Sequence, residues 1–102
     1  MTPQKVLITV IRELVQTGAY KDEQSALRAM AIEQAIKKVK EYRRTIAKFQ
    51  RKYKIKDLQE FTLEIEGQAS IQQEDDWLEW KGASVMLEGW EKTFRKLTSS
   101  DV

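Results

Sequence analysis

The chain has 102 residues, of which 41% are hydrophobic and 33% charged, so it can fold as one domain around a single small core. It contains no cysteine and no histidine, which excludes disulfides, thiolate or imidazole metal sites, and the commonest catalytic bases and nucleophiles. No apolar run is long enough to span a bilayer and no signal-peptide pattern is present, so we expect a cytoplasmic protein that does not enter a membrane.

The net charge of +2 conceals two oppositely charged blocks. Residues 37–56 hold ten lysines and arginines against one glutamate, and residues 57–91 hold ten acids against one lysine. Blocks of opposite charge attract each other. We therefore expect the two blocks to pair, either within one chain or between two copies.

The first predicted element is a helix over about residues 3–17. Pro3 suits the first helical position, and Gly18 suits the position just past the end. The apolar residues between them have helical spacing: Val6, Leu7, Val10, Ile11, Leu14 and Val15. A strand over residues 5–10 is the alternative, because valine, isoleucine and threonine favour sheets.

A second helix is predicted over about residues 22–54, with Asp22 as its N-terminal cap. At 1.5 Å per residue it would be about 50 Å long. Two apolar series recur every seventh residue along it: Ile32, Val39, Ile46 and Tyr53, and Ala35, Tyr42 and Phe49. This heptad pattern defines one seam that another helix must cover.

A third, short helix is predicted over about residues 57–66, capped by Asp57 and closed by Gly67. Apolar residues at positions 58, 61 and 65 share one helical face. The alternation of apolar residues at 61, 63 and 65 also fits a strand, so helix and strand both remain open for this segment.

The fourth predicted helix covers about residues 70–97, and Ser70 and Gln73 have the spacing of a capping box. Two heptad series mark its seam: Trp80, Leu87 and Phe94, and Ala83, Trp90 and Leu97. Gly82 and Gly89 lie on a neighbouring face, although glycine inside a helix costs up to about 1 kcal/mol relative to alanine. We interpret them as a place where another backbone approaches closely.

These elements predict an all-α fold, a single domain over residues 1–102. We expect a helical hairpin or coiled-coil-like bundle of two long and two short helices. The two seams should pack against each other with the long helices antiparallel, within a homodimer.

No catalytic, cofactor or metal site is expected. Asp75 and Glu79 lie four residues apart on one helical face, a spacing that Mg²⁺ ligands can have. A negatively charged first turn that stabilises its own helix explains the same residues more simply. We therefore expect a protein that is not an enzyme.

The basic block is a candidate nucleic-acid surface, because dense lysines and arginines on a helix neutralise phosphates. The aromatic residues among them belong to the seam, which favours burial over base stacking. The candidate residues are Lys37, Lys40, Arg43, Arg44, Lys48, Arg51 and Lys52.

The last predicted helix is a candidate protein-binding surface, because large aromatic residues are enriched at interaction hot spots. Three tryptophans would anchor the contact and four acids would steer it. The candidate residues are Trp77, Trp80, Trp90, Glu74, Asp75, Asp76 and Glu79. Whether the tryptophans are core or interface remains open at this point.

Two segments resemble known antitoxins. Gly18-Ala19-Tyr20-Lys21-Asp22-Glu23 with Ala26-Leu27-Arg28-Ala29 resembles the helix–loop–helix portion of ribbon–helix–helix antitoxins, in which these alanine and leucine positions pack in a dimer core. Glu74-Asp75-Asp76-Trp77-Leu78-Glu79-Trp80 with Met86-Leu87-Glu88-Gly89-Trp90, preceded by Lys52-Tyr53-Lys54 and Phe61, is similar to the tail of small helical antitoxin-like proteins of prokaryotic toxin–antitoxin operons.

The resemblance implies a non-catalytic protein that neutralises a partner toxin through its acidic, tryptophan-rich C-terminal helix. Two other functions fit the residues. One is nucleic-acid binding by residues 37–56, and the other is a self-assembling coiled-coil structural protein without a further partner.

Overall fold

The computed structural model describes residues 3–99, which form four α-helices and no strand. They are α1 (Pro3–Gln16), α2 (Glu23–Tyr53), α3 (Leu58–Ile65) and α4 (Ile71–Thr98). The helices predicted over residues 3–17 and 57–66 are confirmed, and the strand alternatives for both segments are wrong. All four helices begin and end within one residue of the predicted bounds.

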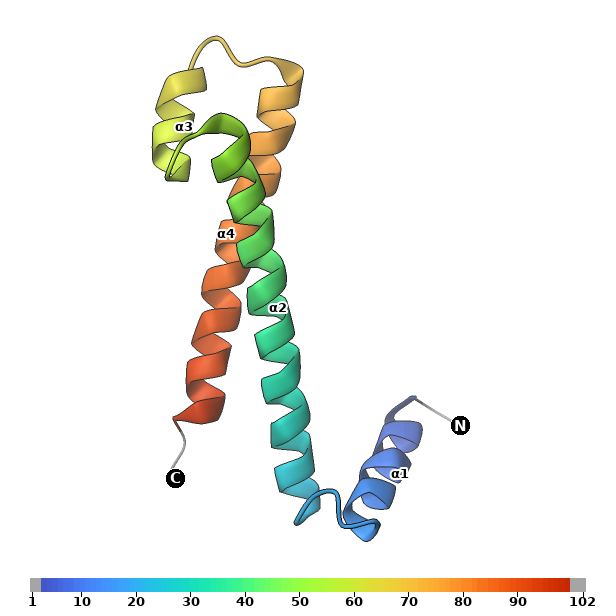
Figure 1. Ribbon diagram of the computed structural model, residues 1–102. Helices are drawn as coiled ribbons and strands as arrows, with labels where there is room; N and C mark the ends of the chain where they lie inside the picture. The colour runs from blue at the N-terminus through green and yellow to red at the C-terminus, as the bar shows by residue number, and fades with distance from the viewer. Residues whose placement is uncertain (1–2, 100–102) are drawn as a thin grey trace.

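The two long helices form an antiparallel hairpin (Figure 1). α3 lies at the end where α2 finishes and α4 begins, and α1 lies at the opposite end. We call residues 46–80 the head of the hairpin, and residues 23–36 with 91–98 its foot. The molecule measures 59 × 34 × 19 Å, so the expected hairpin is present in an elongated form and the four helices do not gather into a compact bundle.

Side-chain caps fix where the helices start. Asp22 accepts a hydrogen bond from the backbone N–H of Ser25 at 2.7 Å, and Asp57 accepts one from the N–H of Glu60 at 2.8 Å. Ser70 and Gln73 form the predicted reciprocal box in front of α4. Each cap satisfies backbone donors that have no partner within the helix, so the sequence itself sets these starts.

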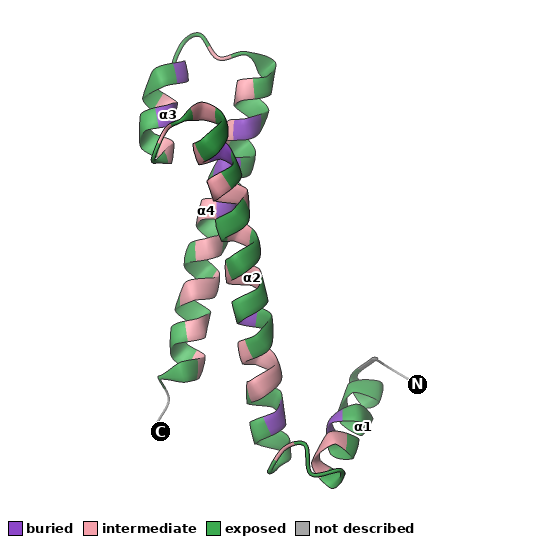
Figure 2. Cartoon of the chain, viewed as in Figure 1, coloured by how far each residue is buried: buried purple, intermediate pink, exposed green. Residues whose placement is uncertain are grey.

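Both predicted seams face each other in the hairpin. Every residue of the two heptad series is buried or half-buried, while the outer faces of α2 and α4 are largely exposed (Figure 2). The largest buried side chains are in the head. There Phe49 from α2, Phe61 from α3 and Trp80 from α4 are at most 2% exposed.

The head core is aromatic. The ring of Trp80 stacks on Phe61 at a centroid distance of 5.4 Å and on Phe49 at 6.0 Å. Tyr53 packs on Phe61 at 4.3 Å, and Ile65 closes the cluster. Aromatic pairs add to the free energy gained by burying their area, and this cluster holds the largest fully buried side chains among the described residues.

The foot is packed more loosely. Open hollows lie between α2 and α4, one beside Leu27 and Leu97 and one beside Ile36 and Phe94. The guanidinium of Arg28 closes the end of the hairpin by donating two hydrogen bonds, of 2.8 and 3.0 Å, to the carbonyl oxygen of Leu97. That carbonyl belongs to the last turn of α4, where a cation also interacts favourably with the helix dipole.

α1 packs on the start of α2 through Ile11 and Ala26, both buried. Gly18 follows α1 with φ +81°, the left-handed conformation expected of a glycine after a helix end. Four further apolar side chains of α1 are between 41 and 47% exposed: Val6, Leu7, Ile8 and Val10.

One expectation about the helix interior is wrong for contacts within the chain. Gly82 and Gly89 are exposed, and a Cβ atom added at either would meet no heavy atom within 4 Å. The close approach that we expected at these glycines is therefore not made by another helix of residues 3–99.

Replacing Trp80 by alanine removes the side chain at the centre of the head core. We expect the free energy of unfolding to fall by about 3–5 kcal/mol, the usual cost of truncating a buried aromatic residue. Urea unfolding followed by circular dichroism at 222 nm measures this. The control is Leu63→Ala, an exposed position where the change should stay within about 0.5 kcal/mol. Equal losses in the two variants would contradict an aromatic core in the head.

Candidate functional site

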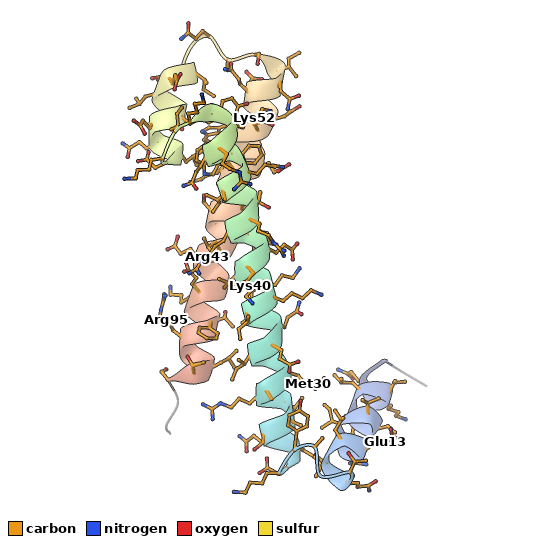
Figure 3. The ribbon with its side chains drawn as sticks, viewed as in Figure 1. Glu13, Met30, Lys40, Arg43, Lys52 and Arg95 are labelled. Carbon is orange, nitrogen blue, oxygen red and sulfur yellow. The ribbon has the colours of Figure 1, made fainter. Side chains whose placement is uncertain are left out.

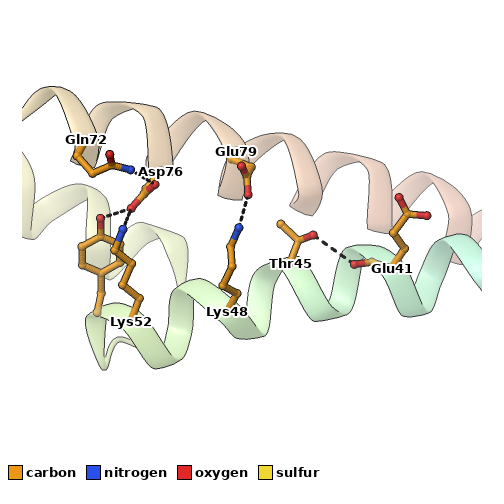
Figure 4. A network of polar contacts seen from close by, with 8 residues as sticks. Glu41, Thr45, Lys48, Lys52, Gln72, Asp76 and Glu79 are labelled. Atoms are coloured by element: carbon orange, nitrogen blue, oxygen red, sulfur yellow. Dashed lines mark hydrogen bonds and ion pairs between the residues drawn. The ribbon is translucent and has the colours of Figure 1, made fainter.

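Ion pairs join the basic block of α2 to the acidic block of α4. Lys52 contacts Asp76 at 2.6 Å, and Lys48 contacts Glu79 at 2.8 Å (Figure 4). Farther toward the foot, Arg43 contacts Glu91 at 2.8 Å. Of the two pairings that the sequence allowed, the chain thus adopts the one within a single copy.

Asp76 is the buried centre of a polar cluster at the head. Its side chain is 9% exposed and accepts hydrogen bonds from the Nζ of Lys52, the hydroxyl of Tyr53 and the Nε2 of Gln72. Burial alone would raise the pKa of Asp76, but these hydrogen bonds outweigh it and hold the pKa below the ordinary value of 3.8. The carboxylate is therefore charged at neutral pH.

The pKa values of two partners of Asp76, the ammonium of Lys52 and the phenol of Tyr53, shift in the opposite direction and are raised. The hydrogen bond to Asp76 raises the pKa of Lys52. Burial, together with the hydrogen bond to Asp76, raises the pKa of Tyr53. All three groups thus keep one protonation state around neutral pH. This suits a role in stabilising the fold and does not suit a site that transfers protons.

The structure places two of the predicted contact residues inside the head. Trp80 is 1% exposed in the aromatic core, and Asp76 is held by its three donors. Neither side chain can touch a partner while the head is folded. Glu79 is exposed but paired with Lys48, and Trp90 is half-buried on the seam.

The other predicted contact residues are accessible. Trp77 is half-buried and donates a hydrogen bond from its indole Nε1 to Thr62 at 2.7 Å, which fixes its ring against α3. Glu74 and Asp75 are exposed on the first turns of α4. These three residues lie at the outer side of the head.

Trp77 lines a groove between α3 and α4 with a volume of about 390 Å³. Its lining is mostly apolar, and two carboxylates, Glu66 and Glu74, stand beside it. The complete lining is Thr62, Ile65, Glu66, Gly67, Ala69, Glu74, Trp77 and Leu78. This groove could not be predicted from the sequence, because five of its eight lining residues come from α3 and the loop that follows, whose placement only the folded chain shows.

The seven candidate nucleic-acid residues divide into two groups. Arg43, Lys48 and Lys52 are occupied by the ion pairs of the seam. The other four form no ion pair within residues 3–99: Lys37, Lys40, Arg44 and Arg51. Figure 3 shows Lys40 and Arg43 midway along α2, Lys52 at the head and Arg95 on α4.

No helix within residues 3–99 is long and apolar enough to cross a bilayer. The same residues contain no group of three acidic side chains arranged to hold a metal ion. Comparison of the chain with protein-family models, curated proteins and solved structures finds no match.

Replacing Tyr53 by phenylalanine removes one donor from the buried Asp76 carboxylate. We expect the free energy of unfolding at pH 7 to fall by about 1.5–3 kcal/mol, the usual contribution of a hydrogen bond to a charged group. A lowered pKa means that this stabilisation is present above pH 3.8 and lost as the pH falls through the folded-state pKa. The difference from wild type should therefore shrink below pH 3.8.

Urea unfolding at a series of pH values checks this expectation. Tyr42→Phe is the matched control, because Tyr42 is also half-buried on α2 and its hydroxyl has no hydrogen bond within residues 3–99. A loss that is the same in both variants, or that does not change with pH, would show that Tyr53 does not stabilise the Asp76 carboxylate.

Proposed function

We propose that this protein is a non-catalytic, antitoxin-like binding protein, and that the groove in its head holds a basic segment of a partner toxin. The observation that carries this proposal is the composition of the groove, an apolar lining beside two carboxylates. Apolar lining supplies affinity by burying surface, whereas carboxylates at the rim select and steer a basic partner.

The charges at the groove are available to a partner. Glu66 and Glu74 form no ion pair within residues 3–99, unlike Asp76 and Glu79, which the seam occupies. Asp75 lies beside Glu74 and is also exposed. The groove therefore has a negative rim although the whole chain carries a net charge of +2.

The groove also gives the three tryptophans distinct roles. Trp77 is the one that lines the groove, so it is the proposed anchor of the contact. Trp80 supports the groove from behind, in the core, and Trp90 belongs to the seam. The acidic, tryptophan-rich segment that resembles antitoxin-like tails thus remains the proposed toxin-neutralising part, with fewer contact residues.

Nucleic-acid binding is the second candidate, and the unpaired bases of α2 favour it. Lys40 borders the hollow between α2 and α4, whereas Lys37, Arg44 and Arg51 recur every seventh residue on the face of α2 opposite its seam. They span about 21 Å of helix. A row of cations over this length can contact several successive phosphates of a duplex.

The groove proposal is tested by co-expression with the product of the adjacent reading frame, using a growth assay and a pull-down. We expect the wild type to restore growth and Glu66→Lys to fail, with complex affinity reduced about tenfold because a rim attraction becomes a repulsion. A lysine just after α3 would place a cation near the C-terminal end of that helix, where it interacts favourably with the helix dipole. The variant should therefore fold.

The matched control is Glu64→Lys, which makes the same charge change on α3 outside the groove. It should protect as well as wild type. A neighbouring product that is harmless alone, or full protection by Glu66→Lys, would refute the proposed toxin contact.

The nucleic-acid candidate predicts binding of duplex DNA that weakens steeply with salt. Replacing Arg44 and Arg51 by glutamine should reduce the slope of log affinity against log salt by about 2, one for each lost phosphate contact. Fluorescence anisotropy with a labelled duplex measures the slope. Lys21→Gln with Lys56→Gln removes the same charge elsewhere and should leave it unchanged. Absence of binding by the wild type would eliminate this candidate.

A further inference from the structure

The outer face of α4, turned away from α2, carries apolar side chains that nothing in residues 3–99 covers. Ile71, Leu78 and Val85 recur every seventh residue and are 79, 62 and 54% exposed. Gly82 and Gly89 lie on the same face, also seven apart, with open space above them. The seam faces inward, so this second heptad pattern has no partner within the chain.

A regular charge pattern runs beside this face. Glu74, Lys81, Glu88 and Arg95 occur at intervals of seven residues, and their signs alternate. All four are exposed, and none forms an ion pair within the described residues. In helix pairs, residues at such flanking positions decide which partner and which orientation is accepted.

We infer that the occupant of this face is a second copy of the chain, docked through α4 in the antiparallel direction. The two-fold axis passes at the level of Ala83 and Ser84. Val85 of one copy then lies over Gly82 of the other, and Leu78 over Gly89. Each glycine leaves the space that the opposing large side chain fills, so the two helices approach closely.

Charge complementarity fixes this register. In it, Glu74 of one copy lies opposite Arg95 of the other, and Lys81 opposite Glu88. Asp75 likewise lies opposite Lys92. The two-fold axis repeats every pair, so each of these six charges meets an opposite charge.

Other arrangements of the same face bring like charges together. A shift of one heptad in one direction places Lys81 opposite Lys81, and a shift in the other direction places Glu88 opposite Glu88. A parallel pair places Asp75 opposite Asp75 and Lys92 opposite Lys92. Repulsion therefore selects against the alternatives, which is how paired helices achieve specificity.

This dimer does not depend on the proposed function. Glu66, the residue that tests the groove, directly follows α3 and lies outside the dimer face, so the dimer and the toxin contact can fail separately. The dimer does share Leu78 and Glu74 with the edge of the groove. The dimer pairs Glu74 with Arg95 and Asp75 with Lys92, so Glu66 is the groove carboxylate that remains for a partner when both contacts form.

Sedimentation equilibrium of the full chain over a range of concentrations tests the inference. We expect the wild type to dimerise, and both Lys81→Glu and Glu88→Lys to raise the dimer dissociation constant about tenfold, because each reversal turns two symmetry-related attractions into repulsions. Combining both changes restores opposite charges and should restore the dimer. Glu33→Lys, an exposed reversal on α2, is the control.

Cross-linking reports the register, since the chain has no cysteine of its own. A mixture of Lys81→Cys and Glu88→Cys chains should be joined by a short bismaleimide, whereas Lys81→Cys alone should not. A monomeric wild type, or a dimer that the charge reversals leave unchanged, would overturn the inference. So would a double variant that is as weak as the single ones.

Discussion

The register between α2 and α4 is the constraint on which the rest of the structure depends. Apolar seams with a seven-residue repeat can slide by one heptad and still bury similar side chains. Three ion pairs favour one register, and only the one at Asp76 is strongly restrictive, because its carboxylate is buried and bound by three donors. A slide would leave that charge buried without partners, which is far more costly than losing an exposed ion pair. Fixed in this way, α4 brings Trp80 into the aromatic core and Trp77 to the edge of α3.

The same pairing decides which charges remain for other molecules. The seam occupies Arg43, Lys48 and Lys52, along with the acids that face them. What remains is divided by location: acids beside the groove of the head, bases on the outer face of α2, and alternating charges on the outer face of α4. A chain whose total charge is close to zero therefore presents three electrostatically different surfaces, each suited to a different kind of partner.

Much of this architecture could be predicted from sequence because it follows from local rules. Caps and heptads require only residues that are close along the chain, and they gave the bounds of the helices and the inward faces of α2 and α4; for α1 the predicted stripe is half wrong, because Val6, Leu7 and Val10 are exposed. The burial of Asp76 also left a signal, since Asp76 lies seven residues before Ala83 and thus continues one seam series; its charge led us to assign it to the surface instead. The groove could not be predicted in this way, because it depends on where α3 packs. The glycines of α4 show the same limit, since a sequence pattern indicates that a helix face is unusual without indicating what meets it.

The unequal packing along the hairpin has a consequence for its dynamics. Large buried side chains hold the head together. The foot relies on smaller apolar contacts and on the two hydrogen bonds from Arg28 to the last turn of α4. Fluctuations that break native structure locally start where the fewest apolar contacts must be broken. Backbone amides near the chain end of α4 should therefore exchange with solvent deuterium well before those near Trp80. We therefore expect the two long helices to separate first at the foot while the aromatic head holds them together. Their facing apolar residues would then become accessible to solvent progressively from that end.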